Sequence, residues 1–271
     1  MLQRIITGAI IAVLMIVLVV FSGTAAFPVV MTLLTVMATY EMLSCVGTVK
    51  NPFICVPALV ASLCSAVCAY FFGYAVCLSV VMMYLVVLMA MCVFFDEKVK
   101  VNDVLCSFSS TLYVMLCFAA FTALRKIDGI GLYMFLLVFI AAWITDTFAY
   151  FTGVFFGRHK LIPRISPKKT VEGSVGGIFF CVLFFFIYGL VLSKCFDVKV
   201  NFGLLMALGF VMSIVSQIGD LIASAIKRNY GIKDYGKLFP GHGGILDRFD
   251  SIMILSPFLL FAGETLNIFV V

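Results

Sequence analysis

Long apolar segments alternate with polar ones along the whole chain. Nine such segments can be separated, each near the roughly 20 residues that a helix needs to cross a bilayer. The joins are mostly short, and the two long polar loops cover 157–172 and 226–249. The pattern therefore predicts an all-α, polytopic transmembrane protein of about nine spans, at 5–22, 27–45, 53–72, 74–94, 104–123, 132–156, 173–193, 202–225 and 250–271.

The composition supports an integral membrane protein. Hydrophobic residues make up 64% of the 271 positions and charged residues only 11%, which excludes an ordinary soluble domain. We expect one integral membrane domain over 1–271, with N-terminal spans in 1–130 and catalytic spans and loops in 131–271. The ten cysteines lie mostly inside apolar runs, so we interpret them as small buried hydrophobes rather than a disulfide frame or a zinc site.

The lysines and arginines indicate an orientation. With nine alternating spans and the N-terminus inside, fourteen of the 18 cations fall on the inner side and four on the outer side. Positive residues accumulate in cytoplasmic loops. The chain is therefore predicted to have a cytoplasmic N-terminus and an outer C-terminus, and both long loops then face the cytoplasm at headgroup level. Basic loops there suit anionic lipids and nucleotides.

The carboxylates near the last loop are the first candidates for chemistry. Asp146 and Asp220 lie inside predicted spans, where ionisable groups are rare and usually face a polar cavity or a partner. Asp247 and Asp250 are three residues apart at the start of the last span, so they share a face if that segment is helical. Helix capping is the simpler role for this pair. Carboxylates with substrate phosphates are also how Mg²⁺ is usually held.

Cations and glycines surround these carboxylates. Lys227, Arg228, Lys233 and Arg248 could bind phosphate, or could only mark topology and snorkel to the surface. His242 could donate to a phosphate, move a proton or be structural. Gly243 and Gly244 allow close approach of backbone N–H groups to a phosphate, just before a helix whose N-terminus favours anions.

A second polar block precedes the seventh span. Ser166, Lys168 and Lys169 are candidates for another phosphate contact. Thr170 is placed to cap the following helix, with Glu172 favourable in its first turn. Gly173 and Gly177 form a GxxxG step that lets another helix approach closely.

These residues carry a family resemblance. From Ser224 to Asp250 the chain reads S-x-x-K-R-x4-K-D-x-G-x3-P-x-H-G-G-x-x-D-R-x-D, which fixes thirteen positions in 27 residues. This closely resembles the pattern of CDP-diacylglycerol synthases, also called phosphatidate cytidylyltransferases. The upstream SPKKTVEGSVGG and the stretch from Asp146 to Gly157 are also similar to that family, whereas the first 130 residues match only as hydrophobic spans.

The resemblance implies a reaction in which CTP and phosphatidic acid give CDP-diacylglycerol and pyrophosphate. It also implies Mg²⁺, with K⁺ as a second cation, and a homodimer in a bilayer, without a nucleic-acid partner. The compact chain is similar to bacterial members, which implies a plasma membrane with the active site facing the cytoplasm. The metal ligands would be Asp220, Asp247 and Asp250. The catalytic set would be Asp220, Lys227, Arg228, Lys233, Asp234, His242, Asp247, Arg248 and Asp250, with Ser166, Lys168, Lys169, Gly243 and Gly244 binding ligand.

Two other functions are compatible with parts of the pattern. A CTP-dependent polyprenol or dolichol kinase would share the membrane site, the nucleotide and the metal, but would transfer the γ-phosphate. A cation-coupled transporter could use Glu41, Asp146, Asp220 and Glu264. Of these four residues, only Asp220 has a role in the enzyme hypothesis. Polar residues concentrate at one predicted surface rather than deep in several spans, and this favours an enzyme.

Overall fold

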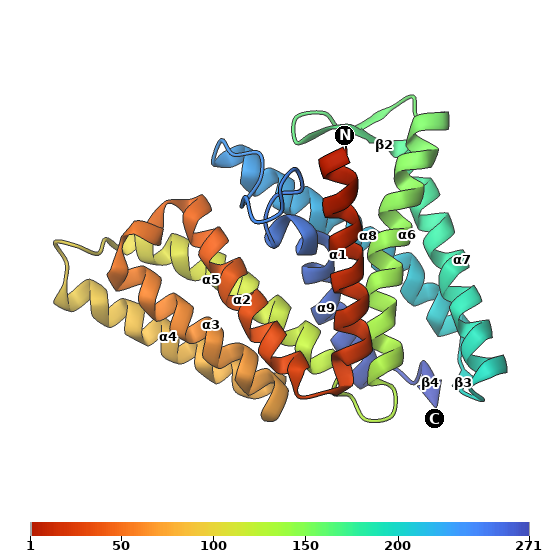
Figure 1. Cartoon of the computed structure of the whole chain (residues 1–271), viewed down its shortest axis with the longest axis horizontal. Coiled ribbons are helices and arrows are strands. Elements are labelled where there is room, and N and C mark those ends of the chain that lie inside the picture. Colours follow the sequence, from red (N-terminus) through yellow and green to blue (C-terminus); the bar gives the residue numbers. More distant parts are fainter. Residues whose placement is uncertain (1, 271) are drawn as a thin grey trace. The chain divides into compact units, whose positions relative to one another are not determined.

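The computed structural model describes residues 2–270, without the side chains of residues 2–6 and 9. Over these residues the chain forms nine α-helices and two short antiparallel strand pairs (Figure 1). The helices are α1 (Leu2–Val20), α2 (Ala26–Val46), α3 (Pro52–Phe71), α4 (Tyr74–Phe94), α5 (Val101–Leu124), α6 (Gly131–Phe156), α7 (Val171–Cys195), α8 (Phe202–Asn229) and α9 (Leu246–Thr265). The strands are β1 (Lys160–Ile162), β2 (Ser166–Thr170), β3 (Lys199–Val200) and β4 (Phe269–Val270).

Seven of the helices in the described chain, α2 to α8, are long and apolar enough to cross a membrane. The protein is therefore a helical, polytopic integral membrane protein, as the hydropathy pattern predicted. The number of nine spans and the orientation of the two termini stay predictions. The strand pairs, β1 with β2 and β3 with β4, were not predicted, because their few residues carry no alternating pattern.

The last two helices differ from their predicted bounds. Helix α8 continues past residue 225 to Asn229, so Lys227 and Arg228 lie in its last turn rather than in a loop. Cations are favourable there because they complement the negative end of the helix dipole. Helix α9 begins at Leu246 rather than at residue 250 and ends at Thr265, because β4 pairs with β3. Residue 271, at the predicted end of that span, lies outside the described residues.

The chain divides into two compact units. The first contains the residues up to Ala123 together with Asn229–Phe249, and the second contains Leu124–Arg228 together with the residues from Asp250 onward. The single membrane domain and its division after residue 130 stay predictions.

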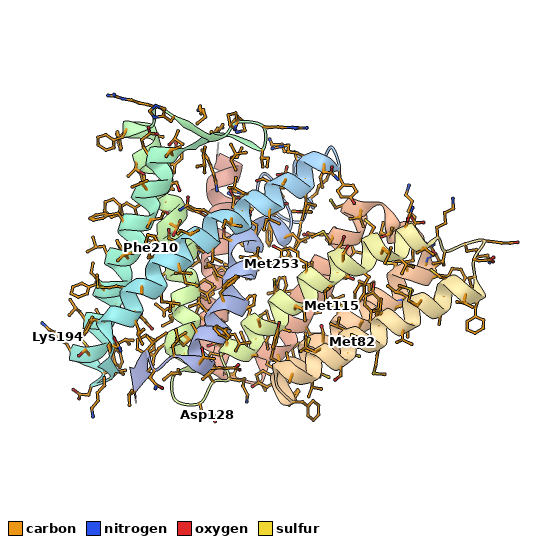
Figure 2. All side chains as sticks on the ribbon, turned by 180° about the vertical axis from the view of Figure 1, so that it is seen from behind. Met82, Met115, Asp128, Lys194, Phe210 and Met253 are labelled. Atoms are coloured by element: carbon orange, nitrogen blue, oxygen red, sulfur yellow. The ribbon has the colours of Figure 1, made fainter. Side chains whose placement is uncertain are left out.

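A core of α3, α4 and α5, joined by Leu43 of α2, holds the first unit together. Leu88 and Met115 are fully buried in it, whereas Met82 on α4 is 59% exposed (Figure 2). A helix with one buried face and one open apolar face is expected where lipid is the solvent. All ten cysteines are free, and five of them are buried, as predicted: Cys45, Cys55, Cys77 and Cys117 in this unit, and Cys181 in the other.

Small residues set the contact between α6 and α7 in the second unit. A Cβ added at Gly173 would lie 2.5 Å from the Ala149 carbonyl oxygen, and one added at Gly177 would lie 2.9 Å from that of Thr145. The predicted GxxxG step is therefore confirmed as a close helix contact. The β1–β2 hairpin lies at one end of these two helices, and the β3–β4 pair lies at the other end, near Lys194 (Figures 1 and 2).

This close contact leads to a stability prediction. Gly173→Ala is expected to lower the free energy of unfolding by about 1–3 kcal/mol, because the methyl group meets backbone that cannot rotate away. The thermal unfolding midpoint in detergent would measure the loss. Gly203→Ala is the control, since a Cβ there meets only the Asn201 side-chain oxygen at 3.6 Å. Equal midpoints for the two variants would contradict the prediction.

Candidate functional site

A polar cavity of about 720 Å³ lies in the second unit, between α6, α7, α8 and the β1–β2 hairpin. It is placed at the hairpin end of the helices. Charged and hydroxyl groups from the three helices and the hairpin line it. Its polar lining includes Asp146, Lys160, Ser166, Lys168, Lys169 and Asp220.

An ion pair joins the hairpin to α8 at this cavity. Lys169 Nζ of β2 contacts Asp220 Oδ2, and each side chain is about one quarter exposed. The prediction from sequence placed both residues in one site without linking them. The pair therefore positions a cation and a carboxylate together in the lining of the cavity, with the Lys169 Nζ atom itself buried.

Two further carboxylates lie near Asp220. Helices α8 and α9 approach closely at Gly219, where an added Cβ would lie 3.2 Å from the Asp250 carbonyl oxygen. Asp250, Asp220 and Asp146 interact electrostatically with one another, and the cations that offset them are Lys169 and Lys227. This part of the unit therefore gathers more negative than positive side chains. Asp146 had no role assigned from sequence.

The hairpin is attached to α7 by two side chains. The Thr170 hydroxyl oxygen accepts a hydrogen bond from Gly173 N at 3.1 Å, so Thr170 caps α7 as predicted. Glu172 accepts hydrogen bonds from the backbone N–H groups of Arg158 and His159, and its Oε1 lies 2.6 Å from His159 Nδ1. These bonds hold Lys168 and Lys169 at the start of a rigid helix rather than on a free loop.

The glycine-rich loop belongs to the first unit and is organised by Asp247. Its Oδ2 accepts hydrogen bonds from Tyr235 N at 2.8 Å and Gly244 N at 2.9 Å. Gly243 has a positive φ of 79°, and a Cβ there would lie 2.5 Å from Asp247 Oδ2. Glycine is therefore required at this position both for the backbone conformation and for the approach of the carboxylate.

Glu41 of α2 holds the same loop from the other side. Its two carboxylate oxygens accept hydrogen bonds from Ile245 N at 3.0 Å and Leu246 N at 2.9 Å, and the side chain is buried. A Cβ added at Gly244 would lie 2.1 Å from Glu41 Oε1. Sequence reasoning assigned Glu41 no role here because some 200 residues separate the partners. The only feature of the sequence that could have drawn attention to Glu41 is its position as a carboxylate inside an apolar span.

The N–H groups at the start of α9 are thus occupied by carboxylates of the protein. The sequence favoured a phosphate at this helix N-terminus, whereas Asp247 and Glu41 bind Gly244, Ile245 and Leu246 there. Asp247 is the second residue of α9, and its carboxylate binds N–H groups of the preceding loop, so it holds that loop rather than serving as the N-cap that was the simpler role weighed for it. Its role at a metal, and those of Gly243 and Gly244 at a ligand, stay predictions.

The other predicted residues are placed as follows. Lys227 is half-buried and Arg228 exposed in the last turn of α8, while Lys233 and Asp234 are exposed on the loop. Nδ1 of His242 is buried and makes no hydrogen bond within the described residues. No group of three or more His, Cys, Asp or Glu side chains that could hold a metal ion occurs in the described part of the chain. Asp220 and Asp247 belong to different units, so their pairing at one metal stays a prediction.

Comparison with known proteins decides the family. The model of the cytidylyltransferase family matches residues 2–266. The chain belongs to this family. Membership confirms the resemblance seen in the signature from Ser224 to Asp250, and it extends the likeness over the N-terminal helices, where sequence reasoning found only hydrophobic spans.

Individual members of the cytidylyltransferase family are similar over part of the chain. A phosphatidate cytidylyltransferase of Bacillus subtilis is 41% identical over 152 residues, which are 56% of this chain and 55% of that protein. One of Staphylococcus haemolyticus is 46% identical over 150 residues, 55% of each chain. One of Staphylococcus epidermidis is 47% identical over 129 residues, 48% of each. The chain thus spans about half the length of the curated relatives it matches.

Proposed function

We propose that this protein is a nucleotidyltransferase that transfers CMP from CTP to phosphatidic acid, giving CDP-diacylglycerol and pyrophosphate. The observation that carries the proposal is the polar cavity of the second unit, where lysines and aspartates gather at one end of apolar helices. Family membership and the names of the relatives support the same reaction. Such a cavity suits a reaction between a phosphate held at headgroup level and a soluble nucleotide.

The chemistry follows from charge. A phosphate oxygen of phosphatidic acid attacks the α-phosphorus of CTP, the bond to the β-phosphate oxygen breaks, and pyrophosphate leaves with that electron pair. The nucleophile is already anionic, so no dedicated base is required. The protein then needs to bring two polyanions together and to neutralise them. Lys160, Lys168 and Lys169 line the cavity, and their positive charge supports this role for them.

The carboxylates of the second unit carry a negative charge that a divalent cation would balance. Asp146, Asp220 and Asp250 outnumber Lys169 and Lys227, which interact with them, so this cluster has a negative charge to be balanced. We assign Asp220 and Asp250 to Mg²⁺, while the part of Asp247, which the signature also implies, stays a prediction from the sequence. When bound, the metal would neutralise phosphate oxygens and orient them. We further propose that K⁺ binds as a second cation and that the protein is a homodimer. We place it in a bacterial plasma membrane, with its active site facing the cytoplasm.

An assay with labelled nucleotide tests the reaction. Purified protein in detergent is given phosphatidic acid, Mg²⁺ and CTP labelled at either the α- or the γ-phosphate. We expect α-label in the lipid phase and γ-label only in pyrophosphate. Transfer of γ-label to a polyprenol would instead identify a kinase, and ion flux into sealed vesicles without CTP would identify a transporter. Either result would overturn the proposed function.

A further inference from the structure

A second cavity, in the first unit, is almost wholly apolar. It has a volume of about 260 Å³ and lies between α1, α2 and the segment 239–249. Leu18 and Phe27 are buried in its wall, whereas Leu14 is 52% exposed and Val30 is 40% exposed. The cavity is therefore closed on one side and open to the surroundings on the other. For α2, a helix suited to a bilayer, those surroundings are lipid.

Arg248 is the one charged residue among the described residues that line this cavity. Its Nε is buried and makes no hydrogen bond within the described part of the protein. A buried donor without a partner is costly, and it gains most from a ligand that supplies an acceptor. The guanidinium group matches phosphate geometry. An apolar cavity with this single cation is therefore complementary to a molecule with an apolar body and an anionic group.

We propose that this cavity binds one acyl chain of an anionic phospholipid, with the lipid phosphate at Arg248. The size of the cavity favours a chain over a peptide, since a helix with its side chains is about 10–12 Å across and could not be seated in this volume. Taking phosphatidic acid as the lipid rests on the proposed function. The acyl-chain site itself rests only on the lining and on Arg248.

The site is connected to the glycine-rich loop. Phe239, Ile245 and Phe249 line the cavity, and the Ile245 N–H group donates to Glu41. An acyl chain packed against Ile245 would bury apolar surface on the segment whose backbone Glu41 and Asp247 hold. Occupation of the cavity is thus expected to stabilise the loop that immediately precedes the first turn of α9, where Arg248 lies. Chain length and shape would then affect binding through this contact.

Photolabelling tests the site by binding rather than by turnover. The purified protein is incubated with phosphatidic acid that carries a diazirine midway along one acyl chain, in the presence of excess neutral phospholipid. After irradiation, labelled peptides are located by mass spectrometry. We expect label on α1 and α2 residues of the cavity. Val30→Phe narrows the cavity and is expected to reduce this label about tenfold.

Val29→Phe is the matched control, because Val29 has the same side chain on the same helix but does not line the cavity. Its labelling is expected to stay at the level of the unchanged protein. Arg248→Gln is expected to reduce labelling by phosphatidic acid more than labelling by a phosphatidylcholine probe. Two results would overturn the site, because each would mean that the probe reacts only from the bulk lipid. One is equal labelling of the Val29→Phe and Val30→Phe variants. The other is that Arg248→Gln reduces labelling by the phosphatidic acid and phosphatidylcholine probes equally.

Labelling and turnover together separate the two proposals. Selective labelling of the cavity without transfer of CMP would leave the acyl-chain site intact and contradict the proposed function. Transfer of CMP without selective labelling would overturn the acyl-chain site alone.

Discussion

Asp220→Asn is expected to reduce transfer of the CTP α-phosphate to lipid by about a thousandfold, with folded protein retained. The substitution removes the negative charge that pairs with Lys169 and that we assign to the metal. The measurement is α-label in the lipid phase over a range of Mg²⁺ concentrations. Asp128→Asn is the control, because Asp128 is exposed in the loop before α6, away from the polar cavity (Figure 2). Turnover near that of the control would end the assignment of Asp220.

A double variant separates chemistry from folding at the same position. Asp220→Asn leaves Lys169 without its carboxylate in a partly buried place, and an unpaired charge there lowers stability. Adding Lys169→Met removes that charge, so the thermal midpoint is expected to recover while turnover stays lost. Recovery of turnover in the double variant would show that the ion pair has only a structural role.

Glu41→Gln is expected to lower both stability and turnover, although Glu41 lies outside the signature. A glutamine keeps one acceptor but turns an NH₂ group toward a backbone N–H, so one of the amides of Ile245 and Leu246 loses its partner. An unsatisfied buried donor costs about 1–3 kcal/mol. Displacement of the loop by about 1 Å could reduce turnover about a hundredfold. Thermal unfolding and the α-label assay measure the two effects.

Glu264→Gln is the matched control for Glu41. It makes the same chemical change on an exposed side chain in the last turn of α9. We expect it to leave stability and turnover unchanged. A positioning role for Glu41 also predicts that added CTP cannot restore the maximal rate of Glu41→Gln. If saturating substrate restored the full rate, Glu41 would be a substrate-binding group instead.

Most of the helices, and part of the candidate site, could be predicted from local patterns. Apolar runs of spanning length located the helices, and the GxxxG step at Gly173 and Gly177 identified a close helix contact. The cap at Thr170 followed from residue type and spacing alone. Such features depend on neighbours a few residues away, so the sequence contains all that is needed to infer them.

Features that depend on distant partners were missed or only partly described. Helix α8 extends through Lys227 and Arg228, where their charges indicated a loop. The Lys169–Asp220 pair joins a strand and a helix 51 positions apart, and Asp146 lines the same cavity from a second helix, α6. The hydropathy pattern of a sequence cannot predict such contacts, because they form only when separate elements pack together.

The order of residues along the chain was enough to predict an apolar helical membrane protein. It was also enough to find, between Ser224 and Asp250, a sequence motif that predicts binding of phosphate groups. This holds because hydropathy and motif spacing are properties of the chain itself. Only the folded arrangement decided what the signature residues touch. Asp247 and Glu41 bind the amides that a phosphate was expected to reach, and Arg248 faces an apolar cavity. Buried polar groups must find partners, and which ones they find depends on the elements that packing brings beside them.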